Sequence, residues 1–206
     1  MPAKHEDLHG NVPDKSPTAM LLVDVINDFE FDTGERLFEQ ALPAAQRIAE
    51  LARRARAEGI PVIYANDNFG RWRSDFTEVV EHCLEDGVRG KPIAELLRPE
   101  EDDYFVLKPK HSAFFETTLE ILLRYLEVDT LILCGFSGDI CVLFTASDAY
   151  MRDHHLIVPR DCVASVNPRE NSRVLAYMKR NLDAVITPST ELDLDALRSR
   201  PYHRRD

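Results

Sequence analysis

Six nearly continuous apolar runs limit the architectures that this chain can adopt. A strand with one face in water alternates apolar and polar residues, whereas these runs are apolar at almost every position. Such strands are typical of parallel sheets that are covered by helices on both faces. The runs occupy residues 19–26, 60–66, 104–108, 130–136, 155–159 and 184–187. They predict an α/β protein of three α/β/α layers, doubly wound around a mainly parallel six-stranded sheet.

The segments between the apolar runs predict the covering helices. Apolar residues recur at helical spacing within 48–55 and again within 119–126. A third helix is indicated by Asn167, Pro168 and Glu170, which occupy the N-cap, the first helical position and the capping-box position. Alternation of strands and helices in this order favours right-handed crossovers between neighbouring parallel strands.

Length and composition favour a single domain. A chain of 206 residues with 44% hydrophobic and 30% charged residues can bury a core without disulfides or metals. We expect a flexible, proline-containing arm at residues 1–17, one domain at 18–197 and a basic tail at 198–206. The region 67–103 separates two strands by a long excursion, and insertions of this kind often shape an active site.

Charge and motifs disfavour several classes of function. The net charge of −11 opposes binding to nucleic acid, and no segment approaches the length of a membrane span. No Gly-x-Gly-x-x-Gly motif follows the first strand, which excludes a dinucleotide-binding dehydrogenase. The cysteines, Cys83, Cys134, Cys141 and Cys162, form no Cys-x-x-Cys pair or zinc-type cluster. Reduced thiols in the cytoplasm are therefore expected.

Three polar residues stand at the ends of predicted strands, where doubly wound sheets bind their ligands. Asp24 interrupts the run AMLLVDVI, Lys108 closes YFVLK, and Cys141 follows TLILCGFSGDI. Each has an ordinary structural explanation when it is considered alone. Cys141 is expected in the first turn of a helix, where the helix dipole and a nearby ammonium would favour its thiolate. Together the three residues indicate a nucleophile with a base and a cation beside it.

The segments that carry these residues resemble the signature segments of a known superfamily. LLVDVINDF, VLKPKHSAFFET and CGFSGDICVLFTASDAY, with DCVAS at 161–165, are similar to those of the isochorismatase-like cysteine hydrolases. This superfamily includes nicotinamidases and N-carbamoylsarcosine amidase. The similarity extends from about residue 18 to 190 and implies a Rossmann-like domain that commonly assembles as a homodimer or homotetramer.

The resemblance also implies residue roles. Asp24 would be the base that takes the thiol proton, Lys108 would stabilise charge, and Cys141 would attack carbon. A non-proline cis peptide is implied between Phe136 and Ser137. The backbone N–H groups of Ser137 and Cys141 would form an oxyanion hole. The implied reaction cleaves the C–N bond of a small amide, carbamoyl or ureido compound through a thioester, without a cofactor.

Two departures from the superfamily pattern qualify the implied substrate. Nicotinamidases have an Asp and several histidines at the second strand, where this chain has Asp67 but reads YANDNFGRWRSDF. Because imidazoles are the usual nitrogen ligands of such a site, we predict no catalytic metal and disfavour nicotinamide as substrate. Gly138 stands where relatives often have Thr, so a side-chain hydroxyl is missing before the nucleophile.

The substrate pocket and two other functions remain open on sequence grounds. Aromatic residues near the motifs could equally pack in the core. The candidates for substrate contact are Phe29, Asn68, Trp72, Ser112, Phe114 and Phe136. A Cys–His hydrolase using His111, His154 or His155 is less favoured, because adjacent histidines on a strand face opposite ways. The alternatives are a vinyl ether hydrolase of the isochorismatase type and a ligand-binding or redox-sensing protein.

Overall fold

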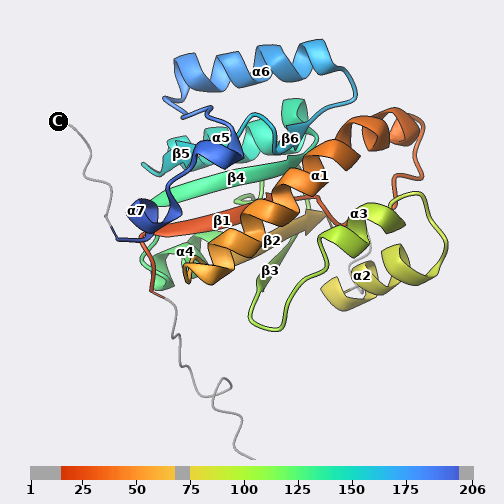
Figure 1. The fold of residues 1–206 in the computed structure, drawn as a ribbon, viewed down its shortest axis with the longest axis horizontal. Helices are drawn as coiled ribbons and strands as arrows, with labels where there is room; N and C mark the ends of the chain where they lie inside the picture. The colour runs from red at the N-terminus through yellow and green to blue at the C-terminus, as the bar shows by residue number, and fades with distance from the viewer. Residues whose placement is uncertain (1–14, 68–74, 200–206) are drawn as a thin grey trace, which may run out of the picture.

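The computed structural model describes residues 15–67 and 75–199, which form three layers with a central sheet (Figure 1). The strands are β1 (Thr18–Val23), β2 (Val62–Asp67), β3 (Tyr104–Lys108), β4 (Thr130–Phe136), β5 (His155–Ile157) and β6 (Val163–Ala164). The α-helices are α1 (Gly34–Ala57), α2 (Phe76–Glu85), α3 (Lys91–Leu96), α4 (Leu119–Tyr125), α5 (Leu143–Tyr150), α6 (Pro168–Asn181) and α7 (Leu194–Ser199). Two short helical turns are η2 (Gly138–Val142) and η3 (Ser189–Glu191).

The sheet is parallel and has the strand order β3-β2-β1-β4-β5, with β6 paired to the carboxyl end of β4. The prediction of six strands in a doubly wound sheet is confirmed. The sixth strand differs from the predicted one. Residues 184–187 contribute only a single bridge, from Val185 to Ile157, whereas Val163–Ala164 pairs with Gly135 and Phe136.

Alternate side chains of the central strands enter two separate cores, as strands buried on both faces require. In β1, Met20 and Leu22 pack on one side, while Leu21 and Val23 pack on the other. Helices α1, α3 and α7 contribute to the first core, and helices α4, α5 and α6 contribute to the second. Figure 1 shows α1 crossing one face of the sheet, with α6 at the edge beyond β4 and β5.

The predicted helices are present, with local detail at their ends. The side chain of Asn167 accepts a hydrogen bond from the Arg169 amide at 2.9 Å, as expected of the N-cap of α6. The Glu170 carboxylate pairs with Arg173 at 2.7 Å. The excursion at 67–103 contains α2 and α3, which pack against each other and, through α3, against α1.

The described structure includes residues just outside 18–197 at both ends. Ser16 is buried, and its amide donates to the Leu126 carbonyl at 2.9 Å, so packing begins before residue 18. Helix α7 extends to Ser199, two residues into the predicted tail. Residues 1–14 and 200–206 lie outside the described residues. Within the described part of the chain, no helix has the length and apolarity needed to cross a membrane.

Candidate active site

The carboxyl ends of β1, β2 and β3 bring three charged residues together. Asp24 follows β1, while Asp67 and Lys108 are the last residues of β2 and β3 and are paired in register. The Lys108 ammonium lies 2.8 Å from Asp24 Oδ2 and 3.8 Å from Asp67 Oδ2. Because parallel strands end at the same edge of a sheet, residues far apart in the chain meet here.

Lys108 is fully buried, so its ammonium is not a surface charge. Its Nζ donates to the Lys110 carbonyl at 3.2 Å and lies 3.8 Å from Cys141 Sγ. Burial alone would lower the Lys108 pKa, but the negative charge of Asp24 and the hydrogen bond to it outweigh this effect, and the pKa is raised. The side chain therefore stays an ammonium between a carboxylate and a sulfur.

Asp24 is fixed by both its backbone and its side chain. The residue adopts the left-handed conformation, with φ of 52°, which aspartate tolerates better than most residues. Its Oδ1 accepts a hydrogen bond from the Asp67 amide at 2.8 Å. Burial raises the pKa of the Asp24 carboxyl, against the opposing effects of Lys108, Cys141 and the Asp67 amide. A carboxylate with a raised pKa is a stronger base for a thiol proton.

Cys141 lies in the π-helical turn η2, between β4 and α5, and is half-buried. The Asp24 carboxylate lies close enough to this thiol for each group to shift the pKa of the other. The expectation of a lowered thiol pKa is wrong. Burial and the negative charge of Asp24 raise the Cys141 pKa, and Lys108 offsets only part of this rise. The sulfur is therefore a protonated thiol that faces the Asp24 carboxylate.

The turn before the nucleophile is held by β6 and α6. The Phe136–Ser137 peptide bond is cis, as the resemblance implies. The Asp139 amide donates to Ser165 Oγ at 3.1 Å, and this hydroxyl donates to Asn171 Oδ1 at 2.9 Å. A Cβ on Gly138 would lie 2.4 Å from Asn171 Oδ1 and 2.9 Å from Ser165 Oγ. These two side chains therefore occupy the space that a threonine at 138 would need.

Four residues predicted to contact substrate are packed against other elements. Phe29 and Phe136 contact each other in the core, with ring centroids 6.3 Å apart, and are at most 1% exposed. The Ser112 hydroxyl donates a hydrogen bond to Asp148 of α5. The Arg152 guanidinium carbon lies over the Phe114 ring, 4.8 Å from the ring centroid. Packing accounts for the burial of all four. Asn68 and Trp72, the other two candidates, lie outside the described residues.

The structure adds His111 to the group around the sulfur. His111 Nδ1 lies 3.8 Å from Cys141 Sγ, whereas His154 packs on Phe114 and His155 begins β5. The sequence contains His111 within the second motif segment, but its distance from Cys141 depends on the path of the loop after β3. Asp67, whose carboxylate lies 3.8 Å from the Lys108 ammonium, is a second residue of this group that is absent from the predicted catalytic residues.

The remaining cysteines lie within the core. Cys134 and Cys162 are fully buried, and burial raises the pKa of the Cys134 thiol well above its usual range. Cys83 is also fully buried, and burial raises its pKa to about 12. Each of these thiols is thus enclosed in the core.

The described residues do not supply the ligands of a metal centre. Among residues 15–67 and 75–199, no cluster of three or more His, Cys, Asp or Glu side chains could hold a metal ion. The Asp67 carboxylate has the Lys108 ammonium beside it, at 3.8 Å. Residues 68–74, which follow Asp67, lie outside the described residues. No step of the reaction proposed below is assigned to a metal.

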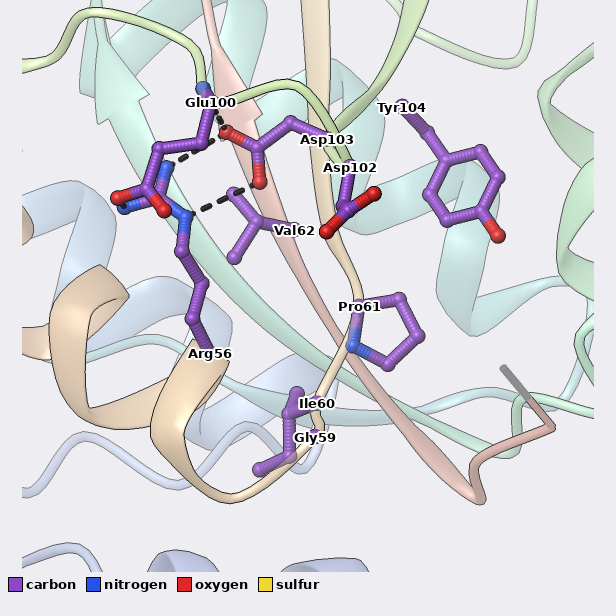
Figure 2. A pocket seen from close by; sticks show the side chains of 9 residues that line it. All are labelled: Arg56, Gly59, Ile60, Pro61, Val62, Glu100, Asp102, Asp103 and Tyr104. Atoms are coloured by element: carbon purple, nitrogen blue, oxygen red, sulfur yellow. Dashed lines mark hydrogen bonds and ion pairs between the residues drawn. The ribbon is translucent and has the colours of Figure 1, made fainter. Parts of the chain in front are cut away.

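A cavity of about 500 Å³ lies at the amino ends of β2 and β3, the ends opposite to those that carry Asp67 and Lys108 (Figure 2). In Figure 2 the Arg56 guanidinium lies between Glu100 and Asp103, at 2.9 and 2.6 Å. The residues that line this cavity include no cysteine, serine or histidine. Because it lies at the amino ends of the strands, the sheet separates it from Cys141, and we assign no reaction to it.

Comparisons with known proteins agree with the fold. The isochorismatase domain family model matches residues 18–190. The uncharacterised isochorismatase family protein YaaI of Bacillus subtilis (strain 168) is 42% identical over 178 residues, which cover 86% of this chain and 97% of YaaI.

Two solved structures are similar over most of their length. The N-carbamoylsarcosine amidase of Thermoplasma acidophilum is 28% identical with a TM-score of 0.64, covering 85% of this chain and 98% of that one. The pyrazinamidase/nicotinamidase of Streptococcus mutans UA159 is 27% identical with a TM-score of 0.65, covering 82% and 99%. The family match, the relatives and the shared fold agree: this chain belongs to the isochorismatase family of hydrolases.

Proposed function

We propose that this hydrolase cleaves the C–N bond of a small carboxamide, carbamoyl or ureido compound, with Cys141 as nucleophile. The observation that carries the proposal is the position of Lys108 Nζ, 2.8 Å from Asp24 and 3.8 Å from Cys141 Sγ. The name of the solved N-carbamoylsarcosine amidase supports the substrate class. The negative charge of Asp24, which lies close enough to raise the pKa of the Cys141 thiol, supports the direction of the first proton transfer.

In the first half of the proposed reaction, Asp24 takes the thiol proton while the sulfur attacks the substrate carbonyl carbon. The negative charge that develops on the carbonyl oxygen is accepted by the backbone N–H groups of Ser137 and Cys141. Asp24 then donates its proton to the departing nitrogen. The C–N bond breaks, ammonia or an amine leaves, and the acyl group remains on Cys141 as a thioester. In the second half, water hydrolyses the thioester and releases the acid.

Lys108 has an electrostatic part in this scheme. The thiol has a raised pKa, so forming its thiolate requires nearby positive charge as the proton leaves. The buried ammonium provides that charge at 3.8 Å from the sulfur. Removing it would disfavour the thiolate and also leave the Asp24 carboxylate without its partner.

The proposal is tested by turnover and by covalent trapping. Purified protein is incubated with N-carbamoylsarcosine, N-carbamoylglycine and nicotinamide, and released ammonia or amine is measured. Cys141→Ser keeps the shape of the side chain and is expected to abolish turnover, while Cys83→Ser, at a remote thiol, keeps it. An aldehyde analogue of any active amide should add its mass to the wild type and not to Cys141→Ser. Turnover that persists in folded Cys141→Ser protein contradicts the mechanism.

We also propose that the protein forms a homo-oligomer. Ile140, Phe144 and Met151 recur at helical spacing along η2 and α5, and all three are more than two-fifths exposed. Exposed apolar residues that share one helix face are typical of protein interfaces. Sedimentation velocity of the wild type and of Phe144→Glu tests this, because a dimer or tetramer should dissociate in the variant. A wild-type monomer at micromolar concentration contradicts the proposal.

A further inference from the structure

The second half of the proposed reaction requires a group that activates water. Asp24 serves the first half from a buried position. It is only 6% exposed. Its carboxylate is occupied by the Asp67 amide and the Lys108 ammonium, both at 2.8 Å. Water that attacks a thioester on Cys141 arrives from solvent. Asp24 and Lys108, by contrast, lie on the buried side of the sulfur.

His111 adjoins the same sulfur and is exposed to solvent. Its Nδ1 lies 3.8 Å from Cys141 Sγ, and its ring is tilted against Phe144, with centroids 5.7 Å apart. Imidazole can accept a proton from water and return it, which is the chemistry that the second half-reaction requires. The ring is therefore close enough to the reacting sulfur and accessible to the water.

The backbone on both sides of His111 is anchored. The Lys110 carbonyl accepts a hydrogen bond from Lys108 Nζ at 3.2 Å. On the other side, the Ser112 hydroxyl bonds to Asp148, and the Ala113 amide donates to Thr145 Oγ1 at 3.0 Å. These contacts tie the loop to β3 and to α5, so the position of His111 is built into the fold.

We propose that His111 is a further catalytic residue, which acts as the general base for hydrolysis of the thioester on Cys141. The inference rests on the proposed function. The imidazole takes a proton from water as the water oxygen bonds to the acyl carbon. The C–S bond then breaks, the acid leaves, and the imidazolium returns the proton to the sulfur. The enzyme ends the cycle with a neutral imidazole and a thiol, and no other reactant is consumed.

The test separates acylation from deacylation with 4-nitrophenyl acetate as the probe. Attack by Cys141 releases nitrophenolate and leaves an acetyl thioester, so rapid mixing measures acylation as a burst and deacylation as the steady rate. His111→Phe keeps a ring against Phe144 but removes the nitrogens. We expect it to keep the burst, lose about a hundredfold in the steady rate and accumulate acetyl-Cys141 in the mass spectrum. His82→Phe, at an exposed histidine on α2, is the matched control and should match the wild type.

Chemical rescue distinguishes catalysis by His111 from a structural role. In His111→Ala, added imidazole should restore deacylation in proportion to its concentration. The inference is overturned if His111→Phe deacylates at the wild-type rate, or if both phases fall together and imidazole restores neither. A wild type whose Cys141 is never acylated overturns the proposed function as well, so the two failures are distinguishable.

Discussion

At the scale of single residues, Asp24 connects three elements of the site. Its carboxylate meets the Asp67 amide of β2, the Lys108 ammonium of β3 and the Cys141 thiol of η2. Removing a carboxylate and an ammonium from water is costly, and their attraction repays the cost only when both are present. The contribution of the pair to stability therefore depends on its remaining intact.

We predict that Asp24→Asn loses both activity and stability. Loss of the base should lower kcat by about a hundredfold to ten-thousandfold. Because the Lys108 ammonium then lies buried without its 2.8 Å partner, the free energy of unfolding should fall by about 3 to 5 kcal/mol. Urea unfolding and turnover of an active amide measure the two effects.

The double variant Asp24→Asn with Lys108→Met separates the two losses. Methionine removes the uncompensated charge and fills a similar volume, so most of the lost stability should return while activity stays low. Recovery of activity in the double variant would contradict the assignment of Asp24 as base.

The Ser165 side chain occupies the space beside Gly138 and supports the turn that carries Cys141. Its hydroxyl accepts from the Asp139 amide and donates to Asn171, directly behind the nucleophile turn. We predict that Ser165→Ala lowers kcat/KM about tenfold, the equivalent of about 1.4 kcal/mol, because the turn loses its support. Ser172→Ala removes a hydroxyl from the exposed face of α6 and should change nothing. Equal kcat/KM for both variants contradicts a role for Ser165 in positioning the turn.

At the scale of elements, the close approach of β1 and β4 decides where Asp24 and Cys141 meet. Gly135 is paired with Val23 and has φ of 132°, and a Cβ there would lie 2.0 Å from the Val23 carbonyl oxygen. Only glycine allows this approach one residue before Asp24. The ends of β1 and β4, rather than any loop, thus set the distance between Asp24 and the turn η2 that carries Cys141.

We predict that Gly135→Ala destabilises the protein by about 3 kcal/mol or more, because both the backbone conformation and the contact with β1 are lost. Gly87→Ala is the matched control. Gly87 also has a positive φ, of 70°, but nothing lies within 4 Å of its added Cβ, so the variant should lose only about 1 kcal/mol. Equal losses, measured by chemical denaturation, contradict the argument from close approach.

The pattern of apolar runs predicts five of the six strands but not the sixth. Residues 184–187 are as apolar as a strand, yet they follow α6 and meet only the end of β5. Val163–Ala164 is too short to register as a run and becomes a strand because Gly135 and Phe136 present their backbone to it. Pairing at a sheet edge depends on the neighbour that is available, which local sequence does not contain.

At the scale of the whole molecule, the sequence predicts which residues meet but not the electrostatics that follow. Asp24, Lys108 and Cys141 are recognisable because each polar residue closes an apolar run. The raised pKa of the Cys141 thiol is not recognisable, because it results from burial and from the Asp24 charge in the folded state. The proximity of His111 likewise depends on a loop anchored by Lys108 and Thr145, contacts that no spacing rule encodes.

Because several titratable groups are buried, we predict that the free energy of unfolding falls on both sides of neutral pH. Burial lowers the pKa values of His154 and His155, so below about pH 6.5 the unfolded chain binds protons that the native state refuses. Burial raises the pKa values of Cys83, Cys134 and Cys141, so above about pH 9 the unfolded chain releases protons that the native state retains. Unfolding is favoured in both ranges.

We expect the free energy of unfolding, measured by urea titration from pH 5 to 11, to be highest between these limits. Each buried thiol adds at most about 1.4 kcal/mol per pH unit to the alkaline decline. Cys83→Ser removes one of these thiols far from Cys141, so its decline should be shallower by about that amount, whatever its stability at pH 7. If the variant and the wild type have the same alkaline slope, the Cys83 thiol ionises alike in the folded and unfolded chains. Burial of that thiol would then not contribute to the decline.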